Sequence, residues 1–312
     1  MGALQNRHLI GLEYTPREDI QKLIDTGFTF REVLARPIKK VPSLTGINVV
    51  NLFFENSTRT RISFELAEKR LSADVTNFSA SSSSVSKGEG LKDTIQNIHA
   101  MKMDCVVMRH PVPGSCYHLS RFIDAVVINA GDGTHEHPTQ ALLDMMSIQE
   151  KFGKINGLNI AIVGDICHSR VALSNIYGLK KMGASVTLCG PPHLIPVGIE
   201  GLGVEVNHNI DEVIEWADAL NILRIQRERM GIGIIPSVRE YRDFFGITEE
   251  RLRNHKKEVV IMHPGPMNRG VEIDSSVADG DQAIILDQVL NGVAVRMSIL
   301  YLLLGQQEEV EN

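Results

Sequence analysis

Cysteine is scarce in this chain, with four residues among 312, and no two of them form a C-x-x-C pair. We therefore expect neither a disulfide framework nor a cysteine-based metal site. Such isolated thiols are typical of reduced, mostly buried cysteines in a cytoplasmic protein. The four are Cys105, Cys116, Cys167 and Cys189.

Positive charge is also in short supply. Lys and Arg total 32 against 38 Asp and Glu, which gives a formal net charge of −6. Non-specific nucleic-acid binding needs a dense cationic surface, so nucleic acid is not expected as a partner. Any anion-binding site must instead be a local group of arginines in an acidic background.

Several signatures of other protein classes are missing. The residues after Met1 form no continuous apolar region, so a secretory signal is not expected. No segment reads as the roughly 20 apolar residues of a membrane helix. The phosphate-loop motif G-x-x-x-x-G-K-[ST] is absent, and no predicted strand leads into G-x-G-x-x-G, which argues against nucleotide and dinucleotide sites. The sequence predicts a cytoplasmic protein without membrane contact.

What the chain does have is an alternation of short apolar runs with helical stretches. This order predicts an α/β fold with two doubly wound parallel-sheet domains. Runs rich in Val and Ile predict buried strands at 47–54, 105–108, 125–129, 159–163, 185–189, 219–223 and 259–262. Periodic stretches predict helices at 62–71, 91–100, 139–152, 170–182 and 211–216.

The two ends of the pattern predict how the domains are joined. Thr15-Pro-Arg-Glu18 reads as a capping box that starts a first helix, which ends by Pro37. The last apolar run, 283–304, predicts one or two helices with a break at Asn291-Gly292. With interdomain helices at 139–152 and in this last run, we expect one domain of residues 1–138 plus 290–312 and another of residues 150–286.

Polar clusters follow six of the predicted strands. They occupy 55–61, 109–111, 131–140, 164–170, 224–229 and 263–266. Ligands of open α/β sheets bind outside the carboxyl ends of the strands, so these clusters are the candidate site.

The first cluster, Ser57-Thr-Arg-Thr-Arg61, lies between a strand end and a helix start. A helix N-terminus offers free N–H groups and the positive end of a dipole, and guanidinium groups add bidentate contacts. An ordinary N-cap with solvated charges would explain a shorter run. For this run the composition favours a phosphate cradle.

The residues at this point resemble a known family. Phe53-Phe-Glu-Asn-Ser-Thr-Arg-Thr-Arg-Ile-Ser-Phe-Glu65 resembles the carbamoyl-phosphate signature shared by aspartate and ornithine carbamoyltransferases. Val107-Met-Arg-His110, Asn129-Ala-Gly-Asp-Gly133 and His137-Pro-Thr-Gln140 extend the resemblance, which covers about residues 8 to 304. It implies that the first domain binds carbamoyl phosphate and the second binds the amino-acid acceptor.

The second half indicates which acceptor. Arg224-Ile-Gln226 and His263-Pro-Gly-Pro266 resemble the aspartate members of the family, whereas the D-x-W-x-S-M-G loop and H-C-L-P turn of the ornithine members are absent. Arginines also suit a dicarboxylate better than a cationic side chain. An acceptor such as ornithine is the alternative, and a catalytically silent subunit of a pyrimidine-synthesis assembly is the rival from another class.

The resemblance implies a role for each motif residue in the first substrate's site. Ser57, Thr58, Arg59 and Thr60 would hold the phosphate, and Arg109 would be shared between the phosphate and the carbonyl oxygen. His137 would donate to that oxygen and Gln140 would orient the carbamoyl amide, while the backbone at Pro264 and Gly265 would accept from the reacting amines. Arg59, Thr60, Arg109 and His137 are the expected catalytic residues.

The same resemblance implies that Arg170, Arg224 and Gln226 bind L-aspartate. In this family the site lies between subunits of a homotrimer, and Ser83 and Lys87 would come from a neighbour's Ser-rich loop, with Lys87 also reaching aspartate. The trimer would act alone or within a larger assembly with dihydroorotase or regulatory chains.

The implied reaction is direct attack of the aspartate amine on carbamoyl phosphate, giving N-carbamoyl-L-aspartate and phosphate in pyrimidine biosynthesis. It requires neither a metal nor an organic cofactor. His135 and His137 lie near Asp132 and Glu136, but their spacing matches no usual metal signature. Glu136 stands where many members of the family carry Gln.

Overall fold

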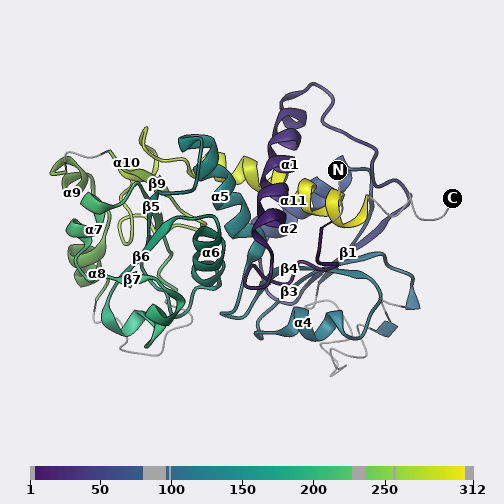
Figure 1. Cartoon of the computed structure of the whole chain (residues 1–312), viewed down its shortest axis with the longest axis horizontal. Coiled ribbons are helices and arrows are strands. Elements are labelled where there is room, and N and C mark those ends of the chain that lie inside the picture. The colour runs from purple at the N-terminus through teal and green to yellow at the C-terminus, as the bar shows by residue number, and fades with distance from the viewer. Residues whose placement is uncertain (1–3, 80–95, 98–99, 227–236, 256–257, 306–312) are drawn as a thin grey trace. The chain divides into compact units, whose positions relative to one another are not determined.

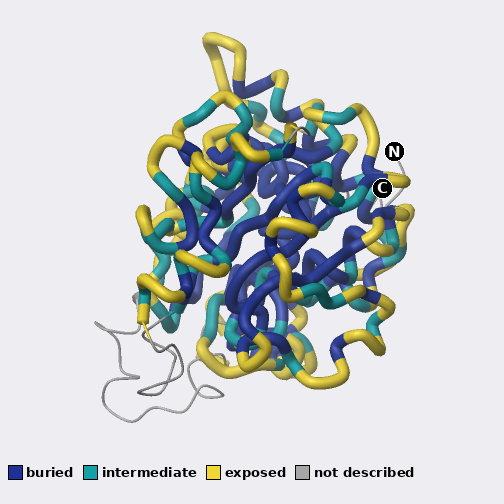
Figure 2. Tube along the Cα trace, turned by 90° about the vertical axis from the view of Figure 1, so that its left-hand side faces the viewer, coloured by how far each residue is buried: buried dark blue, intermediate teal, exposed yellow. Residues whose placement is uncertain are grey.

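The computed structural model describes residues 4–79, 96–97, 100–226, 237–255 and 258–305. The chain forms two compact units. Unit 1 comprises Met1–Met146 with Leu290–Asn312, and unit 2 comprises Ser147–Val289. Figure 2 marks which of the described residues are buried and which are exposed.

Unit 1 is built on a parallel sheet of four strands in the order β2-β1-β3-β4. Helix α4 covers one face, where Val50, Met108 and Leu119 belong to one apolar cluster, and α2 packs on the other (Figure 1). The strands are β1 Asn48–Phe53, β2 Asp74–Ser79, β3 Cys105–His110 and β4 Val126–Asp132. The helices are α1 Arg17–Ala35, α2 Thr58–Arg70 and α4 Ser115–Ser120.

Unit 2 contains a five-stranded parallel sheet in the order β7-β6-β5-β8-β9. Helices cover it as well, and Ile214 of α7 and Ile222 of β8 share one apolar cluster. Its strands are β5 Asn159–Val163, β6 Ser185–Cys189, β7 Glu205–Val206, β8 Ala219–Ile222 and β9 Val260–Met262. Its helices are α6 Arg170–Lys181, α7 Ile210–Trp216, α8 Val238–Phe245, α9 Glu249–Arg253 and α10 Ser275–Ala278, with short 3-10 turns at Pro192–Leu194 and Ile199–Leu202.

The predicted fold class is confirmed, because each predicted apolar run forms a strand within a residue or a few of its expected bounds. Two strands were missed, β2 and β7, and each lies at the edge of its sheet. The predicted helix at 91–100 falls largely outside the described residues.

The predicted capping box at the start of α1 is wrong. The helix begins at Arg17 with Pro16 as its N-cap, and no side chain caps it. The hydroxyl of Thr15 instead donates to the carbonyl of Gly11 at 2.6 Å. Because the Thr15 hydroxyl bonds to a backbone carbonyl one turn earlier in the chain, it does not cap the N–H groups of α1 as the motif predicted.

Two helices cross the boundary between the units in sequence. They are α5 (Pro138–Phe152) and α11 (Ile285–Leu304). The predicted break at Asn291-Gly292 is wrong, because α11 runs through it without interruption. A Cβ at Gly292 would lie 2.7 Å from Nη1 of Arg296 and 3.1 Å from Cδ2 of Leu143, so this glycine permits close packing rather than a turn.

Helix α11 also corrects the expectation that no segment resembles a membrane helix. Its length and composition pass that test, yet 72% of its apolar window is buried inside the protein. A helix that is hydrophobic on all sides and buried is a core helix.

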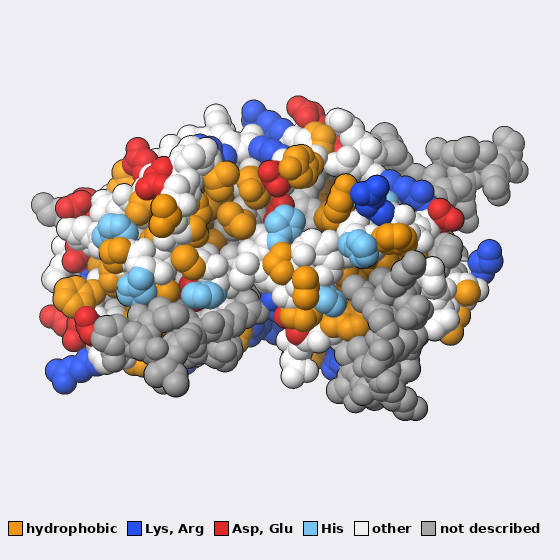
Figure 3. Space-filling model, turned by 90° about the horizontal axis from the view of Figure 1, so that it is seen from below, with side chains coloured by type: hydrophobic (Ala, Val, Ile, Leu, Met, Phe, Trp, Pro, Cys, Tyr) orange, Lys and Arg blue, Asp and Glu red, His pale blue; other side chains and the backbone are white. Residues whose placement is uncertain are grey.

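On the face seen in Figure 3, acidic and basic side chains lie interspersed in small groups.

Candidate active site

The parallel register of unit 1 brings three polar clusters to one edge of its sheet. Phe53 at the end of β1 pairs with Arg109 of β3, and His110 of β3 pairs with Asp132 of β4. The segments that follow these three strands therefore start side by side. This is the edge where open α/β sheets bind their ligands.

The first segment leads into the N-terminus of α2. Ser57 is the N-cap residue, its side chain makes no capping hydrogen bond, and the first turn carries no acidic residue. Thr60 is buried, whereas Thr58 and Arg59 are exposed. The first N–H groups of a helix lack intrahelical acceptors, and the dipole is positive there, so this end of α2 suits an anion.

Arg109 lies beside this turn and is half-buried. Its Nε donates to Oε1 of Glu55 at 2.8 Å, and its Nη1 donates to the carbonyl of Ala130 at 3.3 Å. The first contact is an ion pair whose side chains are 14% and 19% exposed. Glu55 was not among the predicted site residues, although it lies in the signature. Only the β1–β3 register shows that it faces this arginine.

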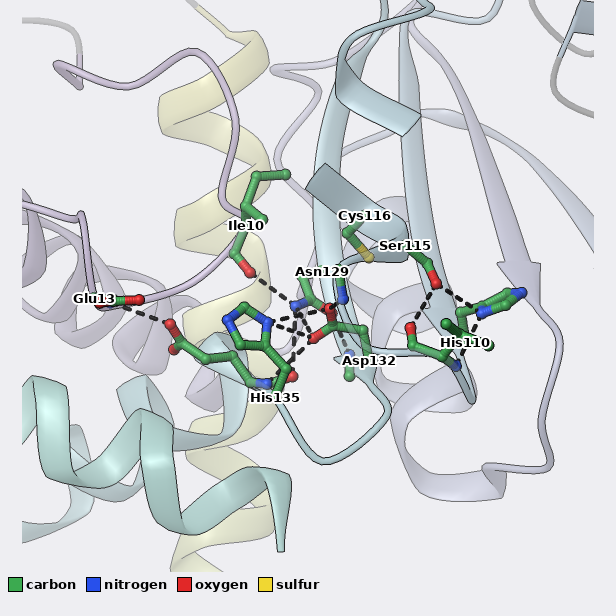
Figure 4. Close-up of polar contacts among 12 residues, drawn as sticks. Ile10, Glu13, His110, Ser115, Cys116, Asn129, Asp132 and His135 are labelled. Atoms are coloured by element: carbon green, nitrogen blue, oxygen red, sulfur yellow. Dashed lines mark hydrogen bonds and ion pairs between the residues drawn. The ribbon is translucent and has the colours of Figure 1, made fainter. Parts of the chain in front are cut away.

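Asn129 and Asp132 organise the segment after β4. Nδ2 of Asn129 donates to the carbonyl of Ile10 at 2.7 Å and to Oδ1 of Asp132 at 2.8 Å, and its Oδ1 accepts from the N–H of Gly131 at 2.7 Å. The second oxygen of Asp132 accepts from the N–H of Gly114 at 2.7 Å (Figure 4). Both side chains are fully buried, so the network fixes the backbone that leads to His137.

His135 and Glu136 belong to the same segment. Nδ1 of His135 lies 3.2 Å from Asp132, and this hydrogen bond raises the pKa of the imidazole (Figure 4). The carboxylate of Glu136 accepts from the N–H groups of Leu12 at 2.7 Å and Glu13 at 3.1 Å. Glu136 therefore links the N-terminal segment to the loop, and these two hydrogen bonds compensate for the burial of its carboxylate.

Glu13, His135 and Glu136 each offer one potential metal-ligand atom, and these atoms lie within 4.8 Å of one another. The hydrogen bonds just described already engage the Glu136 oxygens and Nδ1 of His135. These hydrogen bonds give the cluster a structural role, because they link the N-terminal segment to the loop after β4.

The start of α5 carries the next predicted residues. His137 precedes the helix and is 4% exposed, and its Nδ1 lies 3.5 Å from Oγ1 of Thr139. Gln140 is also buried, and its Nε2 donates to Oδ1 of the fully buried Asp144 at 2.9 Å. Because that contact fixes the amide orientation, the carbonyl oxygen of Gln140 is directed away from Asp144.

Unit 2 gathers its predicted residues in the same way. Arg170 begins α6 after β5 and is 4% exposed, behind an N-cap Ser169 that accepts from the N–H of Ala172. Arg224 and Gln226 follow β8, the neighbour of β5. Nε2 of Gln226 donates to the carbonyl of His168 at 3.1 Å, which joins the two strand ends.

The turn after β9 completes this edge of unit 2. Nδ1 of His263 accepts from the N–H of Gly265 at 2.7 Å, and its Nε2 lies 3.3 Å from the buried Glu272. These bonds fix the half-buried Pro264 and Gly265. Nδ2 of Asn268 donates to the carbonyl of Ile225 at 3.1 Å and links the turn to the segment after β8.

Each unit thus collects its share of the predicted site at the carboxyl edge of its own sheet. Ser57, Thr58, Arg59, Thr60, Arg109, His137 and Gln140 lie in unit 1, and Arg170, Arg224, Gln226, Pro264 and Gly265 lie in unit 2. Ser83 and Lys87 lie outside the described residues.

Two family models together match nearly the whole chain. Residues 7–150 match the model described as aspartate/ornithine carbamoyltransferase, carbamoyl-P binding domain. Residues 156–303 match the aspartate/ornithine carbamoyltransferase, Asp/Orn binding domain.

Individual proteins are similar over almost their full length. The aspartate carbamoyltransferase catalytic subunit of Christiangramia forsetii is 62% identical, with 95% of this chain and 96% of that protein covered. Aspartate transcarbamoylase from Trypanosoma cruzi, solved with carbamoyl phosphate and with N-(phosphonacetyl)-L-aspartic acid, superposes with a TM-score of 0.86 in both complexes, at 31% and 32% identity and 94% coverage of both chains. The ornithine carbamoyltransferase of Pyrococcus furiosus also reaches 0.86, at 25% identity and with 98% and 99% of the two chains covered.

Proposed function

The chain belongs to the aspartate/ornithine carbamoyltransferase family, and we propose that it transfers the carbamoyl group of carbamoyl phosphate to the amino group of L-aspartate. The products are N-carbamoyl-L-aspartate and phosphate, a step of pyrimidine biosynthesis. The observation that supports this function is the position of the arginines. In both units they lie at the carboxyl ends of neighbouring strands, where two anionic substrates need cations.

Unit 1 is the proposed site for carbamoyl phosphate. The N-terminus of α2, with Ser57, Thr58, Arg59 and Thr60, supplies N–H groups, hydroxyls and a guanidinium for the phosphate. Arg109 reaches toward the same edge from β3 and is suited to bridge the phosphate and the carbonyl oxygen. When substrate binds, Arg109 exchanges its contact with Glu55 for a contact with carbamoyl phosphate. In the free protein, Glu55 holds the guanidinium in place.

The proposed site for the carbamoyl group itself is the start of α5. His137 donates to the carbonyl oxygen, and the carbonyl of Gln140, oriented by Asp144, accepts from the carbamoyl amide. Pro264 and Gly265 offer backbone carbonyls to the reacting amines.

Unit 2 is the proposed site for L-aspartate. Arg170 and Arg224 pair with its two carboxylates, and Gln226 adds a hydrogen bond. The choice of aspartate over ornithine rests on these cations and on the higher identity to the aspartate enzymes.

The reaction follows from these positions. The amine nitrogen of aspartate attacks the carbamoyl carbon, a C–N bond forms, and the C–O bond to phosphate breaks with its electron pair passing to the phosphate oxygen. The leaving phosphate takes the proton that the amine loses, so no protein general base is essential. Positioning two anions and stabilising the developing oxyanion supply the rate enhancement.

The active assembly is proposed to be a homotrimer, alone or with dihydroorotase or regulatory chains. Ser83 and Lys87 of a neighbouring subunit would complete each site, and Lys87 would also contact aspartate. An exposed apolar pair on α2 supports an interface: Ile62 and Leu66, four residues apart, are 48% and 39% exposed. The proposed compartment is the cytoplasm, where the four cysteines would stay reduced.

Two measurements test the function. Colorimetric assay with carbamoyl phosphate should yield carbamoylated product from L-aspartate and little from ornithine. Calorimetry should detect tight binding of the bisubstrate analogue that joins a phosphonate to aspartate. Faster carbamoylation of ornithine would reassign the acceptor, and absence of both transfer and analogue binding would identify a silent subunit.

A further inference from the structure

A buried arginine lies behind the proposed carbamoyl-phosphate site and was not among the predicted site residues. Arg296 of α11 is 3% exposed, although arginine is almost never buried unless it is paired. Its Nη1 donates to the carbonyl of Gly292 at 2.9 Å, and its Nη2 donates to Oγ1 of Thr139 at 3.4 Å. Its guanidinium carbon lies 5.1 Å from the ring centre of Phe64.

These contacts join three helices of unit 1. Thr139 is in the first turn of α5, and its hydroxyl lies 3.5 Å from Nδ1 of His137. Phe64 is a fully buried residue of α2, the helix that begins at the proposed phosphate cradle. One side chain of α11 therefore contacts both helices that carry the proposed carbamoyl-phosphate residues.

The electrostatics point to the same cluster. Burial lowers the pKa of Arg296 to about 9, and the charge of Arg109 lowers it as well, while the charge of Asp144 acts in the opposite direction. The guanidinium is still cationic at neutral pH. Asp144 is the residue that orients Gln140, so the charge of Arg296 interacts with Arg109 and with the carboxylate that orients Gln140.

The stability of the fold alone does not account for a positively charged side chain at position 296. Its Nε has no hydrogen-bond partner among the described residues, and the contact with Thr139 is long. A buried charge with incomplete hydrogen bonding costs more than an apolar side chain of similar volume.

We propose that Arg296 is a positioning residue of the carbamoyl-transfer site, which fixes the start of α5, and with it His137 and Gln140, against α2. This inference rests on the proposed function. Arg296 touches no substrate. It acts through the Thr139 hydroxyl, which faces His137, and through the Phe64 ring, which places α2.

Arg296→Met tests the proposal, because methionine fills much of the same volume without charge or donors. Misplacement of His137 and Gln140 should lower kcat by about 10- to 100-fold while the KM for aspartate changes by less than about threefold. Arg296→Lys should recover part of kcat, since an ammonium keeps the charge but cannot donate as a planar fork. All rates are to be expressed per folded site, counted by titration with the bisubstrate analogue.

Arg31→Met is the matched control. Arg31 also contacts α11, where its Nε donates to Oδ1 of Asn291 at 2.8 Å, but it extends from α1. Its loss should lower Tm and leave kcat and KM unchanged. Wild-type kcat in Arg296→Met, with only Tm lowered, would show that Arg296 is merely structural and would overturn the proposal.

Thr139→Val covers the case in which Arg296→Met does not fold. It removes one hydroxyl at nearly constant volume and should lower kcat several-fold. Unchanged kcat in this variant would by itself refute the route through His137. A wild-type chain that fails to carbamoylate aspartate would instead contradict the proposed function, so the two failures are distinguishable.

Discussion

At the scale of single residues, Arg59 gives the most direct test of the proposed phosphate cradle. It lies in the first turn of α2 and is exposed at the end where an anion would bind. Arg59→Ala should cost about 1.5–3 kcal/mol of transition-state binding, or roughly 10- to 150-fold in kcat/KM for carbamoyl phosphate, the worth of a charge-assisted hydrogen bond. Steady-state kinetics with carbamoyl phosphate varied at saturating aspartate measure this loss.

Lys69→Ala serves as the control for Arg59→Ala. Lys69 is a cation in the last turn of the same helix, 60% exposed, and pairs with Glu65 at 2.6 Å. Its removal changes the net charge by the same amount but lies far along α2 from the cradle. Equal kinetic effects of the two variants would mean that Arg59 acts only through general charge.

Motif residues were predictable from the sequence because each follows a strand within a few positions. Residues that act through tertiary contacts were not. Glu55 faces Arg109 only because β1 and β3 pair in parallel register. Arg296 lies 157 residues from Thr139 in the chain, and no local pattern connects them.

At the scale of elements, the packing of α2 on β1 buries a carboxyl group. Glu68 is fully buried, and its Oε2 accepts from Nδ2 of Asn51 at 2.9 Å. Burial raises the pKa of Glu68 to about 8, more than the hydrogen bond from Asn51 lowers it. In the unfolded chain the same carboxyl titrates near 4.3.

This shift predicts a pH dependence of stability. Between about pH 4.5 and 8 the folded protein keeps a proton that the unfolded chain has released, so the free energy of unfolding falls as pH rises, by up to about 1.4 kcal/mol per pH unit. Glu68→Gln keeps a neutral acceptor for Asn51 and should remove this loss. Its stability relative to wild type, from urea unfolding, should therefore increase across that window.

Glu65→Gln is the matched control on the same helix. The hydrogen bond from Lys69 lowers the pKa of Glu65, so this carboxyl is ionised in both states above about pH 5.5. Its effect on stability should not vary with pH there. A flat pH profile for Glu68→Gln as well would mean that the buried carboxyl ionises as readily in the folded protein as in the unfolded chain.

The elements themselves were predictable where the chain buries both faces of a strand. Such strands read as continuous apolar runs, and β1, β3, β5 and β8 are of this kind. The edge strand β2 mixes exposed Asp74, Thr76 and Asn77 with half-buried Val75 and Phe78, so it forms no such run.

The continuity of α11 through Asn291-Gly292 depends on packing against Leu143 and Arg296, which overrides local turn preference.

At the scale of the whole molecule, the proposed trimer predicts complementation between impaired chains. Arg59→Ala and Lys87→Ala chains are each expected to lose most of their activity alone. If every site combines Arg59 of one subunit with Lys87 of its neighbour, random mixing should recover about a quarter of wild-type activity. Mixed trimers prepared by dissociation and reassociation, and assayed against each parent, measure the recovery.

Arg59→Ala mixed with Arg109→Ala is the control for complementation. Both residues belong to unit 1 of the same chain, so no mixed pairing restores a complete set in one subunit. This mixture should stay at the low activity of its parents. Equal recovery in both mixtures, or recovery in neither, would contradict the shared site.

The return of α11 to unit 1 determines when that unit can fold during synthesis. The hydroxyl of Ser298 donates to the carbonyl of Leu23 at 2.7 Å, so residues near the two ends of the chain meet in one core. Unit 2 is a continuous stretch and is complete once residue 289 has left the ribosome, whereas unit 1 still awaits its last helix. On the ribosome, the later-translated unit is therefore the first to be whole, and a nascent chain that stalls before α11 exposes an unfinished apolar core.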